Sequence, residues 1–160
     1  MVDDILARIH ADHEKAMSDL KRIVENVGTT STNTRNADFD RLHLELLGHM
    51  HAEEDILYPL LETPAEGAIR EAMREHRTIR SDLANLGDLW TNERVFTQKL
   101  QKLEQDIKHH VGEEESTIFD AARKVFGSDQ LAEMGQMFEQ EKHVTAQKGL
   151  AEAKRAETST

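Results

Sequence analysis

The chain of 160 residues fits one ordinary domain, and its 8 glycines, 2 prolines and 4% aromatic residues are typical of a helical protein. A formal net charge of −11 argues against nucleic acid or an anionic membrane as the main partner. The absence of cysteine excludes disulfides, thiolate-bound metals and thiol nucleophiles.

Hydropathy and the opening residues predict a cytoplasmic protein. No apolar stretch approaches the roughly 20 residues that a membrane span requires. Residues 1–4 lack the basic and apolar parts of a signal segment. We therefore expect neither a membrane nor a nucleic-acid partner, and a chain that is a monomer or a weak homo-oligomer.

Apolar residues that recur at intervals of three and four predict helices along the chain. The first helix follows a cap at Asp3 or Asp4 and stops at Gly28. The polar run 29–36 predicts a loop, and the second helix begins near Asp38.

Turn residues mark the limits of the next two helices. The second helix ends at Pro64, and the third runs from about Ala65 to Trp90. Thr91 or Asn92 caps the fourth helix, which we expect to stop near Gly127.

Four long amphipathic helices with short or polar connections predict an all-α, antiparallel up-down-up-down four-helix bundle over residues 1–127. Ser128 caps a fifth, shorter helix over residues 128–149, which we expect to pack on the bundle. Residues 150–160 are charged and predict a flexible tail.

The two halves of the predicted bundle carry the same pattern. Residues 13–20 match residues 76–83, since both segments begin with a histidine that follows an acid and end in Ser-Asp-Leu. Residues 49–53 and 110–114 both read His-x-x-x-Glu. The repeat predicts the same chemistry twice, related by a pseudo-two-fold axis along the bundle.

The repeated residues are suited to bind metal. Residues four apart share a helix face, so each His-x-x-x-Glu can offer an imidazole and a carboxylate to one point. Buried carboxylates lose their hydration, and a cation offsets that cost. Imidazole suits iron, zinc, copper and nickel, and two carboxylates can bridge a pair of ions. The predicted metal ligands are His13, His49, Glu53, His76, His110 and Glu114.

Other residues near these ligands have several possible roles. Glu54 and Glu115 each follow a predicted ligand and could replace it. His10 shares a face with His13 and is a further ligand or an outer partner of one. Tyr58 is a phenolate ligand, a redox-active neighbour or a core residue. His51 and His109 are expected at the surface or beside the ligands, and His43 and His143 are expected to face solvent.

The predicted ligands are single histidines on the first and third helices and His-x-x-x-Glu on the second and fourth. This order resembles that of the hemerythrin-like (HHE cation-binding) domains. Residues 53–59 are similar to that family's acidic, apolar and proline-containing helix end, and the resemblance covers about residues 3–125. It implies a cofactor of two non-haem iron ions, bridged by both glutamates and an oxo or hydroxo group. Family members bind dioxygen, respond to peroxide or nitric oxide, or sense iron.

Two positions depart from the oxygen-carrying hemerythrins. Arg80 stands where they place a further histidine, and Glu114 and Glu115 lie where they use an aspartate. The departures leave metal positions open, as catalytic metal sites do. Arg80 is a possible further site residue or outer partner of the ligands, and it could stabilise a bound anion or point to solvent.

The resemblance therefore implies a di-iron protein that binds or reacts with dioxygen-derived species. The leading hypothesis is reaction with peroxide in a catalase-like manner, or with nitric oxide. The alternative is a protein that senses or binds iron or oxygen without turnover.

Overall fold

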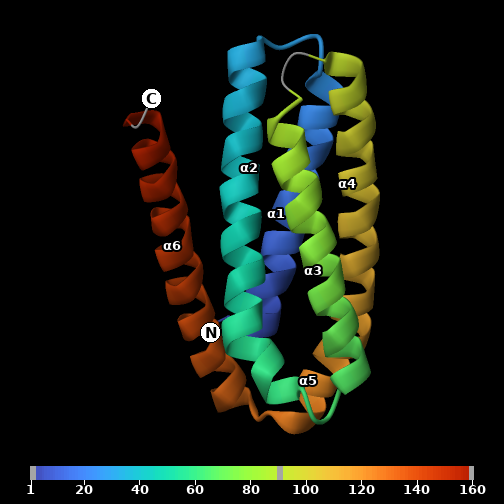
Figure 1. Ribbon diagram of the computed structural model, residues 1–160. Helices are drawn as coiled ribbons and strands as arrows, with labels where there is room; N and C mark the ends of the chain where they lie inside the picture. The colour runs from blue at the N-terminus through green and yellow to red at the C-terminus, as the bar shows by residue number, and fades with distance from the viewer. Residues whose placement is uncertain (1–2, 90–91, 159–160) are drawn as a thin grey trace.

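The computed structural model describes residues 3–89 and 92–158, and contains no strand within them. Four long helices run up, down, up and down side by side, as the sequence predicts (Figure 1). They are α1 (Ile5–Asn26), α2 (Thr32–Ala52), α3 (Glu66–Gly87) and α4 (Glu93–Glu113).

Helices α2 and α4 each continue, at the same end of the bundle, into one π-helical turn that is wider than an α-helical turn. After α2 come a π-helical turn and a 3-10 turn, and after α4 come a π-helical turn and a short α-helix. These elements are η1 (Glu53–Leu57), η2 (Tyr58–Leu61), η3 (Glu114–Ile118) and α5 (Phe119–Val125).

The second helix begins earlier than the sequence predicts. It starts at Thr32, inside the run 29–36 that we expected to be a loop, because the Ser31 side chain accepts a hydrogen bond from the Thr34 amide and caps it. Arg35 adds tertiary support, since its buried guanidinium lies 4.6 Å from the centre of the Phe96 ring.

The other caps fall close to their predicted positions. Asp4 caps α1 by accepting from the Ala7 amide, and Asn92 caps α4 by accepting from the Val95 amide. The predicted end of the third helix at Trp90, and the alternative cap at Thr91, lie outside the described residues.

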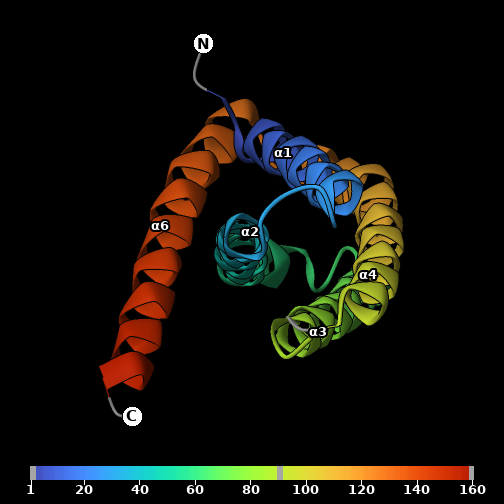
Figure 2. The ribbon, with the colours of Figure 1, turned by 90° about the horizontal axis from the view of Figure 1, so that it is seen from above.

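The last helix is longer than expected. Helix α6 (Ser128–Thr158) spans 31 residues against 22 for α1, so the prediction of a shorter fifth helix was wrong. Its backbone stays helical into the segment 150–160, for which the sequence predicts a flexible tail, because no proline interrupts it. It packs outside α1 and α2 (Figure 2).

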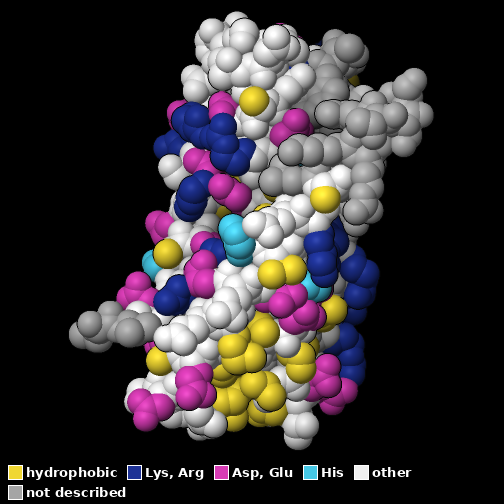
Figure 3. Space-filling model, turned by 90° about the vertical axis from the view of Figure 1, so that its left-hand side faces the viewer, with side chains coloured by type: hydrophobic (Ala, Val, Ile, Leu, Met, Phe, Trp, Pro, Cys, Tyr) yellow, Lys and Arg dark blue, Asp and Glu magenta, His cyan; other side chains and the backbone are white. Residues whose placement is uncertain are grey.

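Two glycines allow α6 to approach the bundle closely. A Cβ on Gly135 would lie 2.9 Å from the Ile5 backbone nitrogen, and a Cβ on Gly48 would lie 2.9 Å from the Lys142 carbonyl oxygen. On the face of the molecule where α6 lies, hydrophobic side chains gather towards the lower end, and charged side chains are interspersed among the described residues above and beside them (Figure 3).

The core consists of two apolar clusters with a polar layer between them. One cluster, which includes Ile9, Leu57 and Phe138, lies towards the end with the wide turns, and the other includes Leu20, Met50 and Leu83. Within the described residues, no helix is long and apolar enough to cross a membrane.

Candidate metal centre

The polar layer contains all six predicted ligands, and each of them is at most 5% exposed. The four histidines come from α1, α2, α3 and α4, and the two glutamates are the first residues of η1 and η3. The six side chains are His13, His49, Glu53, His76, His110 and Glu114.

Each glutamate contacts histidines from both halves of the repeat. Glu53 Oε1 lies 2.9 Å from His49 Nε2 and 3.8 Å from His13 Nε2, while Glu53 Oε2 lies 3.2 Å from His76 Nε2. Glu114 Oε2 lies 3.3 Å from both His13 Nε2 and His110 Nε2. Each glutamate therefore lies between histidines of the first and second halves of the repeat.

Both glutamates begin a π-helical turn. The amide of Tyr58 donates to the Glu53 carbonyl and the amide of Phe119 to the Glu114 carbonyl, five residues apart in each case. Such single wide turns are frequent at functional sites, and the sequence analysis did not foresee them. Their consequence is that a residue five positions after the glutamate returns to the glutamate's side of the helix.

Tyr58 is the residue that the first wide turn brings into the centre. Its hydroxyl donates to Glu114 Oε1 at 2.9 Å and lies 3.4 Å from His76 Nε2 and 3.5 Å from Glu53 Oε2. Burial, followed by the charges of Glu114 and Glu53, raises the pKa of Tyr58 well above its usual value. The hydroxyl therefore keeps its proton as a donor.

Several buried nitrogen and oxygen atoms in the layer that could bind a metal make no hydrogen bond, although they lie close to one another. Buried polar atoms normally have a hydrogen-bond partner. The atoms without one include His13 Nε2, His49 Nε2, Glu53 Oε1 and Glu114 Oε2. The layer contains three groups of three residues whose ligand atoms lie within 4.8 Å of one another inside each group, and each group combines histidine with glutamate. A fourth group, of His51, Asp55 and Glu141, lies nearer the surface. These donors fit the coordination chemistry of a transition-metal ion or a pair of such ions.

A carboxylate from another helix lies behind each histidine. The histidine Nδ1 lies 2.9 Å from a carboxylate oxygen in the pair His49–Asp12, and 2.7 Å in the pair His76–Glu54. The same distance is 2.9 Å in the pair His110–Glu75 and 3.4 Å in the pair His13–Glu115. Carboxylates in this position fix the orientation of metal-binding imidazoles, with Nε2 towards the metal.

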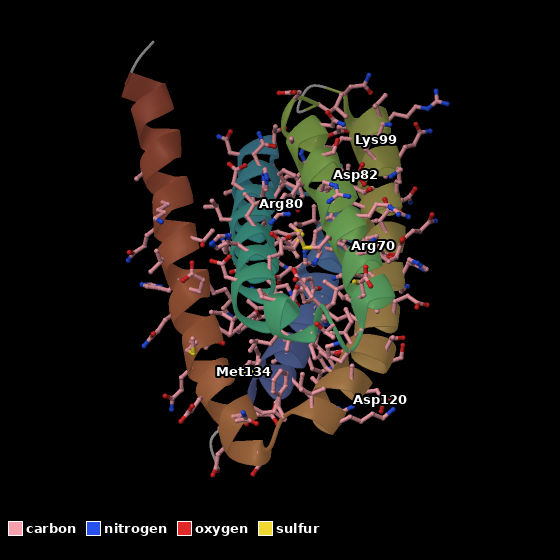
Figure 4. The ribbon with its side chains drawn as sticks, turned by 60° about the horizontal axis from the view of Figure 1, so that its bottom comes forward. Arg70, Arg80, Asp82, Lys99, Asp120 and Met134 are labelled. Atoms are coloured by element: carbon pink, nitrogen blue, oxygen red, sulfur yellow. The ribbon has the colours of Figure 1, made fainter. Side chains whose placement is uncertain are left out.

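Cationic or imidazole groups in turn hold these outer carboxylates. Lys142 on α6 donates to both oxygens of Asp12 at 2.9 Å, and Arg80 donates to both oxygens of Glu54 at 2.8 and 3.0 Å. Figure 4 shows Arg80 between α3 and α2. Arg80 therefore lies behind the metal layer as an outer partner, because it holds the carboxylate that contacts His76.

The neighbouring charges control protonation in the layer. Burial disfavours charged His49 and His110, but Glu53 with Asp12, and Glu114 with Glu75, outweigh it and raise both pKa values to about 10. A cation that binds here takes the place of these protons.

The remaining histidines lie outside the layer. His10 contacts Glu115 and is not among the clustered ligand atoms, so it is an outer partner rather than a ligand. His109 contacts Glu75, His51 contacts Glu141, and His143 is exposed. His43 was expected to face solvent, but it is half-buried beside the Phe39 ring, with its centroid 5.8 Å away.

Comparison with known families agrees with this geometry. The model of the hemerythrin HHE cation-binding domain matches residues 1–122. The chain belongs to this family. The hemerythrin match covers α1 to α5 and all six clustered ligands, whereas α6 lies beyond it. With its buried histidine and glutamate clusters, the chain is a metal-binding protein of the hemerythrin type.

A curated protein named "DNA nickase", from Nostoc sp. (strain PCC 7120), is 28% identical over 101 residues. The match covers 62% of this hemerythrin-type chain and 29% of that protein, so the chain spans less than a third of its relative's length. No solved structure matches the chain significantly.

Proposed function

We propose that this hemerythrin-type chain holds two non-haem iron ions and decomposes hydrogen peroxide in a catalase-like reaction. The observation that carries the proposal is the doubled set of buried histidines and glutamates, with each glutamate between the two halves. Several of their ligand atoms have no hydrogen-bond partner. Six protein ligands shared by two ions leave coordination positions for a small molecule.

The residues have distinct tasks in this proposal. The four histidines would bind iron through Nε2, and Glu53 and Glu114 would bridge the ions. Peroxide disproportionation needs a redox-active metal, and a bound pair of iron ions supplies that chemistry. Tyr58 holds a proton at its hydroxyl, 2.9 Å from Glu114, where it can donate to a ligand in the layer.

Iron content and peroxide turnover of one preparation test the proposal. We expect about two iron ions per chain, as bundles with two ligand sets bind, and oxygen release from hydrogen peroxide. His49→Ala should abolish turnover with the helical content retained, whereas His51→Ala, which changes a histidine paired with Glu141 outside the layer, should leave turnover unchanged. A folded protein with almost no iron, or full turnover in His49→Ala, would contradict the proposal.

Nitric oxide binding and iron or oxygen sensing are the other functions that this centre supports. They predict an absorbance change with nitric oxide, or a change in stability or assembly with iron, without turnover of peroxide. DNA nicking, which the name of the Nostoc protein states, is not proposed here, because a net charge of −11 opposes contact with DNA.

A further inference from the structure

A cavity of about 350 Å³ lies beside the metal layer on the side that α6 covers. Its inner end is lined by His13, His49 and His110, three of the six clustered ligands. Its outer end includes Lys15 and Glu45, which are exposed at the surface. The cavity therefore leads from solvent to the histidines.

The volume of the cavity exceeds what peroxide, dioxygen or nitric oxide needs. Each of these has two non-hydrogen atoms, and a water molecule occupies roughly 30 Å³ in the liquid. By that measure the cavity accommodates about ten non-hydrogen atoms. Pockets for small organic ligands begin at about 300 Å³, so this cavity falls in their size range.

The walls favour a ligand without charge. Apolar side chains from four helices line the middle of the cavity, among them Ala16, Met50, Ile79 and Ile107. The charged side chains at the outer end are already paired. Lys142 binds Asp12 and Glu139, and Lys15 binds Glu45.

We propose that this cavity binds a neutral, mainly apolar organic molecule beside the metal centre. Helix α6 forms one wall through Lys142 and Ala146, so the ligand pocket depends on an element outside the region that the family model matches. The inference rests on the proposed function only in placing the ligand next to iron, and binding itself requires the walls of the cavity.

Calorimetric titration with cumyl alcohol tests the proposal, because this neutral molecule has an aromatic body, one hydroxyl and ten non-hydrogen atoms. The iron content of the same full-length sample is measured in parallel. We expect saturable binding of one molecule per chain. Ala16→Phe and Ala146→Phe fill the cavity from opposite walls and should each weaken binding at least about tenfold.

Ala11→Phe is the matched control, because Ala11 is exposed on α1 and does not line the cavity; it should bind as the wild type does. Ala146 is only half-buried, so its variant remains informative if Ala16→Phe fails to fold. Absence of saturable binding, or unchanged binding in Ala146→Phe, would overturn the pocket even if iron is present. Binding without iron would support the pocket and contradict the di-iron function.

Discussion

Three histidines of the metal layer, His49, His76 and His110, are hydrogen-bonded from behind by a carboxylate on a different helix, and each of these carboxylates has a further partner. His76 illustrates the arrangement, since its Nδ1 lies 2.7 Å from Glu54, which Arg80 holds through both oxygens. Burial opposes the charge of Glu54, but His76 and Arg80 outweigh it and lower the pKa of Glu54 to about 2. The carboxylate is therefore charged at every physiological pH.

Glu54→Gln tests this outer arrangement. The change keeps the shape of the side chain but removes the charge behind His76, so iron affinity should fall about 10- to 100-fold. Competition with a chelator for ferrous iron measures the affinity. Asp55→Asn is the control, because Asp55 is the next residue and contacts His51 near the surface. Wild-type affinity in Glu54→Gln would show that the outer carboxylate does not support the ligand.

The clustering of the inner side chains could be predicted from sequence, whereas their outer partners could not. His49 and Glu53 share a helix face by spacing alone, and the repeat adds the other half. The partnership of Asp12 with His49 depends on how α1 lies against α2, which local spacing does not specify. The sequence position of Arg80 places it near the ligands, but its pairing with Glu54 likewise depends on how α3 lies against the end of α2.

Among the elements, the long helices were predictable because their apolar residues are periodic, and the wide turns were not. The π-helical turn at Glu53 has no characteristic amino-acid pattern that would predict it from the sequence. It differs from an α-helical turn in that the Tyr58 amide donates to the carbonyl five residues earlier, that of Glu53. The start of α2 was missed for a related reason. Its first turn is polar, and its stability depends on the Ser31 cap and on burial of Arg35 against Phe96.

The docking of α6 can be tested through glycine. Gly135→Ala places a methyl group 2.9 Å from the Ile5 nitrogen and 3.0 Å from the Asp3 oxygen, both backbone atoms. We expect a loss of about 1–3 kcal/mol in the free energy of unfolding, from overpacking. Gly112→Ala on α4 meets no atom within 4 Å and should instead gain up to about 1 kcal/mol from helix propensity. Urea denaturation measures both, and equal stabilities would contradict close packing of α6.

At the scale of the molecule, the metal layer separates two apolar clusters that would otherwise form one core. Four imidazoles and two carboxylates occupy the middle of the bundle, with unpartnered atoms among them. An apolar layer would cost less, because buried charged groups lose hydration. Ion binding in this layer therefore couples directly to the stability of the whole fold.

Removal and return of metal should consequently shift the unfolding temperature. A metal at about a hundred times its Kd adds about 2.7 kcal/mol by mass action. For a chain of this size that corresponds to a rise in Tm of about 5–10 °C. Differential scanning calorimetry of chelator-treated protein, before and after ferrous iron is added without oxygen, measures the rise. Replacing both bridging carboxylates, in Glu53→Gln with Glu114→Gln, preserves their size but removes their charge, so the rise should disappear. A rise of the same size in that double variant would place the stabilising metal outside the layer.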